Sequence, residues 1–231
     1  MAHEPTAASN PKARAGGRPS RDEAQAKQLR ILEVAQRVFF AQGYAEATID
    51  TIAHEAGVAK KTLYEHYGDK AGLFAAVMQR LRDAWTRGLH DIVIEATDPR
   101  VALEGVALHL LDMGTRSDML ELHRLLLMEA RRFPDLIDGR YNKRGAPVGM
   151  KPLADYLRRA VKQGSLQLGD IGLATEQFVY LVLGGLRTRM LRGVSVRPNA
   201  TARKRIARQA VTIFLYGCMP QASADTGNSR R

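Results

Sequence analysis

The chain has 231 residues, enough for one large domain or for a small and a medium one. Hydrophobic residues make up 45% of it, which is enough to bury a core and argues against global disorder. The single cysteine, Cys218, excludes a disulfide framework and a zinc site built on several cysteines, and it fits a cytoplasmic location. No stretch has the length and apolarity of a membrane span, and no signal peptide is visible, so we expect no membrane partner.

The formal net charge of +11 suggests a polyanionic partner, but the charge is unevenly distributed. Residues 1–21 carry a net charge of +3 and residues 22–76 a net charge of −2. The excess therefore lies mostly in residues 77–231, which hold 25 Lys and Arg against 15 Asp and Glu. Overall charge does not locate a nucleic-acid site, and local placement has to do so.

Hydrophobic periodicity predicts an all-α chain without a convincing strand or an internal repeat. Residues 1–20 are typical of a flexible basic arm and residues 221–231 of a polar tail. Potential caps precede the helices at Thr48, Asp69, Asp98, Ser117, Asp170 and Asn199. The expected helices cover about 23–42, 49–56, 60–67, 70–95, 99–114, 118–132, 147–163, 171–192 and 200–217, with a short segment over 134–144.

The segment 48–70 carries the functional signal, because its two short helices meet at a glycine turn. Gly57 follows the first helix, and Val58 plugs into the core, as in a helix-turn-helix whose second helix enters the major groove. Leu63 faces inward, and the side chains suited to phosphates and base edges are Lys60, Lys61, Thr62, Tyr64, His66 and Tyr67. The alternative is an ordinary helical hairpin with a polar surface. The paired lysines and the exposed aromatic residues favour DNA binding.

This segment resembles the DNA-binding domain of TetR/AcrR-type regulators. The residues that carry the resemblance are Thr48, Ile52-Ala53, Ala56-Gly57-Val58, Ala59, Lys60, Leu63-Tyr64, Tyr67 and Lys70 to Leu73. The family often has Ser where this chain has Ala59, so one possible phosphate hydroxyl is absent.

The resemblance also implies roles for individual residues. Phosphate contacts are implied for Thr48, Tyr64, Tyr67 and Lys70, and groove contacts for Lys60, Lys61, Thr62 and His66. In the arm, Arg14 or Arg18 would enter a minor groove, unless the arm only aids solubility.

The domains that follow from this resemblance are a helix-turn-helix domain over 21–69 and a helical ligand-binding and dimerisation domain over 70–220. Residues 125–134 and 174–185 look similar to the AefR-like subgroup. The expected dimer interface is formed by Phe178, Leu181, Val182, Gly185, Ile206, Ala210 and Ile213, although these stripes also suit packing within one subunit. Candidate ligand contacts, each of which also suits core or surface, are Trp85, His109, Met113, His123, Met128, Arg131 and Phe178.

An all-helical enzyme is the competing class, and the sequence lacks its motifs. No Glu has a His three residues later, His54-Glu55 lacks the second histidine of a zinc protease, and no phosphate-binding loop is present. A non-specific nucleoid or RNA-binding protein would explain the charge but not the two-helix motif. We therefore expect no catalytic site, metal or cofactor. The expected protein is a homodimer that binds a palindromic DNA operator and responds to an unidentified small molecule, most simply as a repressor. Activation stays open.

Overall fold

The computed structural model describes residues 21–94, 96–129, 131–133 and 148–218, and every regular element within them is a helix. The all-α prediction is therefore confirmed. The arm with Arg14 and Arg18, the segment 134–144 and the tail lie outside the described residues. The elements are α1 (Arg21–Glu46), α2 (Ile49–Ala56), α3 (Lys60–Tyr67), α4 (Lys70–Ile94), α5 (Pro99–Gly114), α6 (Ser117–Glu129), η1 (Val148–Met150), α8 (Lys151–Lys162), α9 (Ile171–Leu191) and α10 (Ala200–Cys218).

Five of the predicted caps hold the helix ends, because each side-chain oxygen accepts a hydrogen bond from an otherwise unpaired amide. The Thr48 hydroxyl accepts from the Thr51 amide at 3.1 Å, and the Asp98 carboxylate accepts from the Arg100 amide at 2.8 Å. The other three capping residues, whose oxygens accept at 2.7–3.0 Å from amides three residues later, are Asp69, Asp170 and Asn199.

The structure differs from the sequence prediction at both ends of α6. The helix includes Ser117, and the Arg116 carbonyl accepts its first hydrogen bond, so Ser117 is not the cap. The helix ends at Glu129 rather than near 132, and the Glu129 carbonyl accepts from the amides of Arg132 and Phe133 in a tight turn. A proline follows at position 134 and disfavours helical geometry at the residue before it.

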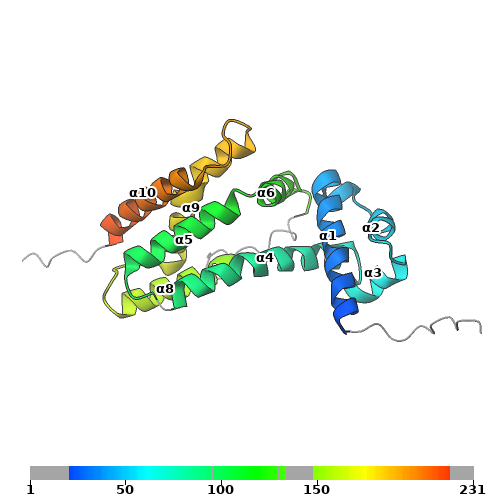
Figure 1. Ribbon diagram of the computed structural model, residues 1–231, viewed down its shortest axis with the longest axis horizontal. Coiled ribbons are helices and arrows are strands. Elements are labelled where there is room, and N and C mark those ends of the chain that lie inside the picture. The colour runs from blue at the N-terminus through cyan, green and yellow to red at the C-terminus, as the bar shows by residue number, and fades with distance from the viewer. Residues whose placement is uncertain (1–20, 95, 130, 134–147, 219–231) are drawn as a thin grey trace, which may run out of the picture.

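The helices enclose two hydrophobic cores, which correspond to the two lobes in Figure 1. The first core lies among α1–α3, and its aromatic centre is the edge-to-face pair Phe39 and Phe74, with ring centroids 5.1 Å apart. The second core lies among α5, α8, α9 and α10, where Phe178 packs against Phe214 with centroids 5.0 Å apart. No described helix has the length and apolar composition needed to cross a membrane.

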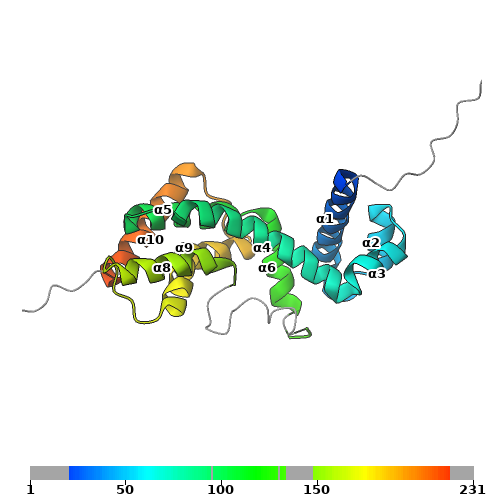
Figure 2. The same ribbon diagram turned by 90° about the horizontal axis from the view of Figure 1, so that it is seen from below.

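Two helices contribute to both cores. In α4, residues 73–81 pack in the first core, and Leu89 and Val93 pack in the second. In α6, Leu120 belongs to the second core, whereas Leu125 and Leu126 belong to the first. Both helices lie at the junction of the lobes in Figures 1 and 2. The predicted domain boundary at 69/70 falls at the start of α4, and the first core extends beyond it.

Candidate functional site

The turn between α2 and α3 fixes the direction of α3. Gly57 adopts a left-handed conformation with φ 67° and ψ 39°, which glycine reaches without the strain that a Cβ would add. Its amide donates to the His54 carbonyl, and the Val58 amide donates to the Ala53 carbonyl at 3.0 Å. The buried Leu63 anchors α3 on the first core, and the opposite face of α3 is left to solvent.

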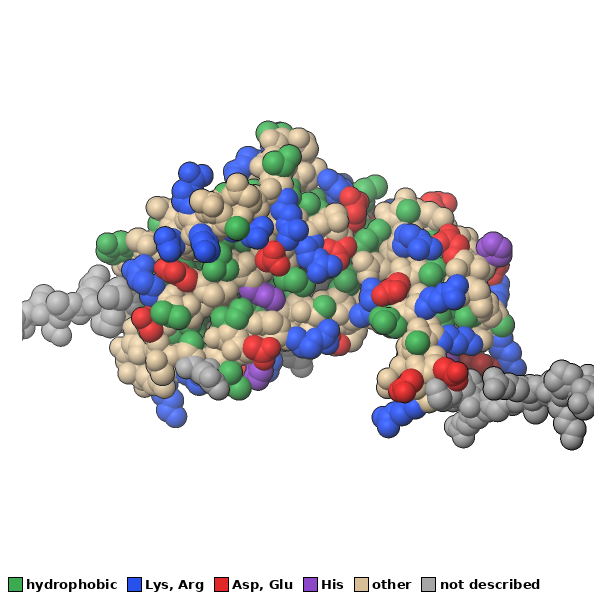
Figure 3. All heavy atoms as spheres, viewed as in Figure 1, with side chains coloured by type: hydrophobic (Ala, Val, Ile, Leu, Met, Phe, Trp, Pro, Cys, Tyr) green, Lys and Arg blue, Asp and Glu red, His purple; other side chains and the backbone are tan. Residues whose placement is uncertain are grey.

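The exposed face of α3 carries most of the residues predicted to read DNA. The Lys61 side chain is 83% exposed and Tyr64 is 45% exposed, while His66 is exposed and Thr62 is half-buried. Figure 3 shows basic and acidic side chains interleaved over this smaller lobe, at its right. The face therefore offers ammonium, phenol and imidazole groups to a polyanion, and carboxylates lie between these groups.

Ion pairs hold the two lysines of α3 in the free protein. The Lys60 ammonium donates to Asp50 at 2.7 Å, and the Lys61 ammonium lies 3.6 Å from Glu65. The hydrogen bond to Asp50 raises the pKa of Lys60. Lys60 also lies 5.9 Å from the ring centre of Tyr64. A phosphate that approaches Lys60 therefore competes with the Asp50 carboxylate for the same charged donor.

The implied phosphate contacts of Lys70 and Tyr67 need correction. The Lys70 ammonium donates to the carbonyls of Ala45 and Ala47 at 2.9 and 3.0 Å, and it lies 4.8 Å from the ring centre of Tyr44. The Tyr67 ring packs on the first core with its hydroxyl buried, and this burial raises the pKa of Tyr67. Both half-buried side chains therefore make contacts within the helix-turn-helix lobe itself.

Thr48 differs from these two residues, because it is exposed at the start of α2. Its hydroxyl caps the helix and also lies 2.9 Å from the Thr51 hydroxyl. The phosphate contact that the resemblance implies for Thr48 stays a prediction.

A cavity of about 360 Å³ lies between the two cores. Of the predicted ligand contacts, Trp85 and His123 line it. The Trp85 ring packs beside Gly114 and Gly149, where a Cβ would lie 3.4–3.5 Å from the indole, in ordinary van der Waals contact. The indole N–H is buried without an acceptor among the described residues. The remaining lining residues are Met78, Leu81, Arg82, Met119, Leu122, Leu127, Met150, Glu176, Val179, Tyr180 and Arg187.

The other five predicted ligand contacts do not line this cavity. His109 fills the space beside Gly88, and its Nε2 donates to the Trp85 carbonyl at 3.0 Å, so it joins α4 to α5. Phe178 lies wholly inside the second core. Of the remaining three, Met113 is half-buried, and Met128 and Arg131 are exposed. The rotation of α6 turns residues 119, 122 and 123 toward the cavity and leaves Met128 outside it.

The predicted dimer residues separate into two groups. Three of them are buried in the second core and present almost no surface to a partner: Phe178, Val182 and Ala210. Ile206 is half-buried and packs against this core, so part of its surface stays exposed. The exposed predicted residues are Leu181, Gly185 and Ile213. Sequence analysis missed further exposed apolar residues on the same two helices: Leu173, Tyr180 and Tyr216. The predicted stripes combined residues that face the core with residues that face solvent. The sequence could not separate them, because both faces of α9 are apolar.

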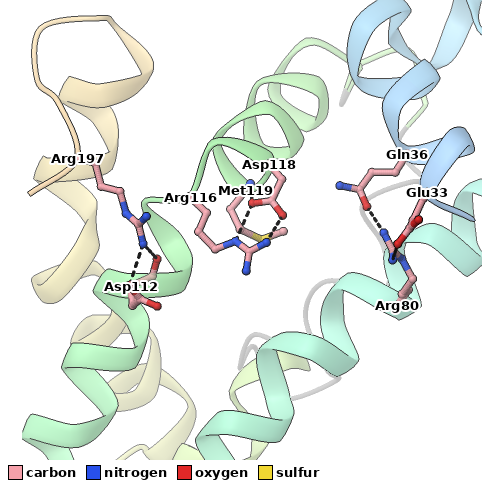
Figure 4. A network of polar contacts seen from close by, with 8 residues as sticks. All are labelled: Glu33, Gln36, Arg80, Asp112, Arg116, Asp118, Met119 and Arg197. Carbon is pink, nitrogen blue, oxygen red and sulfur yellow. Dashed lines mark hydrogen bonds and ion pairs between the residues drawn. The ribbon is translucent and has the colours of Figure 1, made fainter. Parts of the chain in front are cut away.

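Sequence analysis also missed the polar contacts that join elements distant along the chain. In Figure 4, Arg80 of α4 donates to Gln36 of α1 at 2.6 Å and lies 3.4 Å from Glu33. The same view shows Arg197, before α10, paired with Asp112 of α5 at 2.8 Å. The buried Glu129 of α6 accepts from two amides of α1. The one feature of the sequence that could have indicated a buried Glu129 is its position after an apolar run, within residues 125–130.

Family models match most of the chain. Residues 31–77 match the tetR family of bacterial regulatory proteins, and residues 101–217 match the C-terminal domain of AefR-like transcriptional repressors. The second match alone spans half of the chain. The chain therefore belongs to the TetR family of DNA-binding transcription regulators, and the predicted AefR-like resemblance is confirmed.

Individual relatives agree with this assignment. The regulator TtgR of Pseudomonas putida is 27% identical over 71% of this chain and 80% of its own length. The activator FasR of Mycolicibacterium smegmatis is 39% identical, over 39% of this chain and 40% of its own length. The solved flavonoid-responsive regulator FrrA is 26% identical over 86% of this chain and all of its own, with a TM-score of 0.70. A TetR-family regulator of Mesorhizobium loti, 23% identical over 85% of this chain and 98% of its own, shares the fold with a TM-score of 0.71.

The pairing of Lys60 with Asp50 generates a testable prediction. The substitution Asp50→Asn removes the competing carboxylate while it keeps the side-chain shape, so affinity for duplex DNA should rise about two- to fivefold, the scale of one exposed ion pair. Fluorescence anisotropy with a labelled duplex measures the change. The control Glu104→Gln, an acid-to-amide change on α5, should leave affinity unaltered. Equal affinity of Asp50→Asn and the wild-type protein would show that the pair does not restrain Lys60.

Proposed function

We propose that this protein is a ligand-responsive transcription regulator that binds a palindromic operator as a homodimer and releases it when a small molecule binds. The observation that carries the proposal is the exposed basic and aromatic face of α3, held on a helix-turn-helix core in a TetR-family chain. An operator partner implies a cytoplasmic location. The match to the AefR-like repressor model favours repression, by occupation of a promoter.

The DNA contacts follow from the placement of α3. Its N-terminal turn would enter the major groove, with Lys60, Lys61 and Thr62 toward the bases or phosphates and Tyr64 and His66 beside them. One such helix reads too few base pairs for useful specificity. A dimer places two helices in successive major grooves about 34–36 Å apart, and an operator with two-fold symmetry matches it.

The proposed dimer surface is the outer face of α9 and α10. Its apolar residues Leu181, Ile213 and Tyr216 are 39%, 50% and 82% exposed in the single chain. Exposed apolar side chains on two neighbouring helices are typical of an interface. Gly185 is exposed on the same face, where a residue without a side chain permits close approach of a partner helix.

The proposed effector site is the cavity beside Trp85. Its volume lies within the range of small-molecule sites, and its lining is mostly apolar with a few polar groups. The buried Trp85 N–H needs an acceptor, which a ligand oxygen would supply. The relative FrrA is described as flavonoid-responsive, and a flavonoid offers both aromatic rings and oxygen acceptors to such a site. We therefore propose a small, largely apolar effector that carries oxygen acceptors.

Selection of binding sequences from a random DNA pool tests the DNA-binding proposal. Lys61→Ala and Tyr64→Ala should each weaken binding to the selected operator about tenfold, while the fold is kept, because both side chains are exposed. Loss of a phosphate contact should also lower the salt dependence, whereas loss of a base contact should relax specificity at one position. Lys204→Ala on α10 is the matched control and should bind as the wild type. Wild-type affinity in both α3 variants would refute the assignment.

A second experiment tests the dimer. Within one subunit, a Cβ on Gly185 meets only the flexible Arg189 guanidinium, at 3.4 Å, so Gly185→Leu should fold normally. The leucine side chain should hold the two subunits apart. Both dimerisation and operator binding should therefore become weaker. Light scattering at micromolar concentration measures the state of assembly, and Gly169→Leu, in open space in the loop before α9, is the control. A wild-type monomer, or a variant that dimerises as the wild type does, would contradict this interface.

A further inference from the structure

The carboxylate of Glu129 joins α6, which packs in both cores, to α1 at a break in that helix. Glu129 is the last residue of α6 and is only 7% exposed. Its Oε1 accepts hydrogen bonds from the amides of Tyr44 and Ala45, at 3.1 and 3.3 Å, although 84 or more residues separate the partners. These two amides come directly after Gly43, whose φ of 83° and ψ of 165° interrupt the helix.

The break creates the need for this acceptor. Because Gly43 is not helical, the residues after it begin a new helical turn, in which the Ala47 amide donates to the Gly43 carbonyl at 3.3 Å. The first amides of a helical turn have no partner within it, and a carboxylate is the strongest side-chain acceptor for them. Glu129 therefore caps this turn from α6, a helix that packs in both cores. Gly43 also makes room, since a Cβ there would lie 3.1 Å from the Glu129 oxygen.

Among the described residues, the two amides of α1 are the only hydrogen-bond partners of the Glu129 carboxylate, so the contact favours one arrangement of α1 and α6. Its second oxygen, Oε2, is buried without a hydrogen bond among the described residues. A buried carboxylate that loses its donors is unfavourable by more than an ordinary surface pair. A rotation of the first lobe that separates Glu129 from the two amides is therefore resisted.

The same helix forms a wall of the cavity. Met119, His123 and Leu127 of α6 line the cavity, and Leu125 and Leu126 pack in the first core. A ligand that displaces α6 therefore displaces Glu129, which lies two residues beyond Leu127. We propose that Glu129 is a positioning residue that fixes the orientation of the helix-turn-helix lobe and transmits displacement of α6 to it. The second half of this inference rests on the proposed function.

The test compares two substitutions of similar size. Glu129→Gln keeps an oxygen for the two amides, whereas Glu129→Leu fills the space without an acceptor. Spin labels at His54→Cys in α2 and Val101→Cys in α5, in a Cys218→Ser background diluted with unlabelled subunits, report the orientation of the lobes by pulsed electron paramagnetic resonance. We expect one narrow distance distribution for the wild type and Glu129→Gln, and a broader one for Glu129→Leu. The control Glu121→Leu, also on α6, should stay narrow.

Operator affinity of the unlabelled variants gives the second readout. Glu129→Leu should bind about tenfold more weakly, because only part of its population keeps the competent orientation, and Glu129→Gln should bind within about threefold of wild type. Glu129→Ala replaces the leucine variant if that one does not fold. A merely stabilising residue would change the unfolding transition but leave the distances of the folded protein unaltered, and that result overturns the proposal. If the wild type selects no DNA sequence, the proposed function fails, and the distances still decide the role of Glu129.

Discussion

The burial of α4 and α6 in both hydrophobic cores is the constraint on which the rest of the structure depends. A side chain such as Leu81 of α4 or Leu126 of α6 packs with the helix-turn-helix, while Leu89 or Leu120 on the same helix packs with the other lobe. Packed cores change between discrete arrangements rather than deform continuously. A change in the cavity wall, which both helices form, therefore cannot be confined to one lobe.

Polar contacts determine how the small lobe is held on these helices. Arg80 of α4 and Glu129 of α6 reach α1 from two directions, and Lys70 closes the turn between α1 and α2. These contacts fix α1 and the turn that leads to α2, and none of them uses the exposed face of α3. The acidic partners of Lys60 and Lys61 then moderate a face that would otherwise attract any polyanion. Phosphate contacts supply non-specific binding, whereas sequence preference depends on contacts with base edges.

Local signals predicted the fold and the position of α3. Caps such as Thr48 and the turn at Gly57 depend on neighbouring residues in the sequence, so they can be predicted from it. The helical period that predicted an inward position for Leu63 depends on such neighbours too. The contacts of Lys70, Tyr67 and Glu129 could not be predicted in this way, because their partners lie on other elements. Phe178 and His109 were misplaced for a related reason: an apolar stripe shows that a face is buried, but not whether a cavity, a core or a second subunit buries it. The cavity itself requires the arrangement of α4, α6 and α9 in space.

The central claim is that cavity and DNA surface are coupled through α4 and α6. Trp85 is the only tryptophan and lines the cavity, so its fluorescence reports occupancy by a ligand found by screening on that signal. The decisive measurement is the affinity of this ligand with and without saturating operator. Linkage requires operator to change ligand affinity by the same factor by which ligand changes operator affinity. The account predicts equal and substantial factors, about five- to 150-fold for typical coupling. Identical ligand affinities in the two titrations would contradict it.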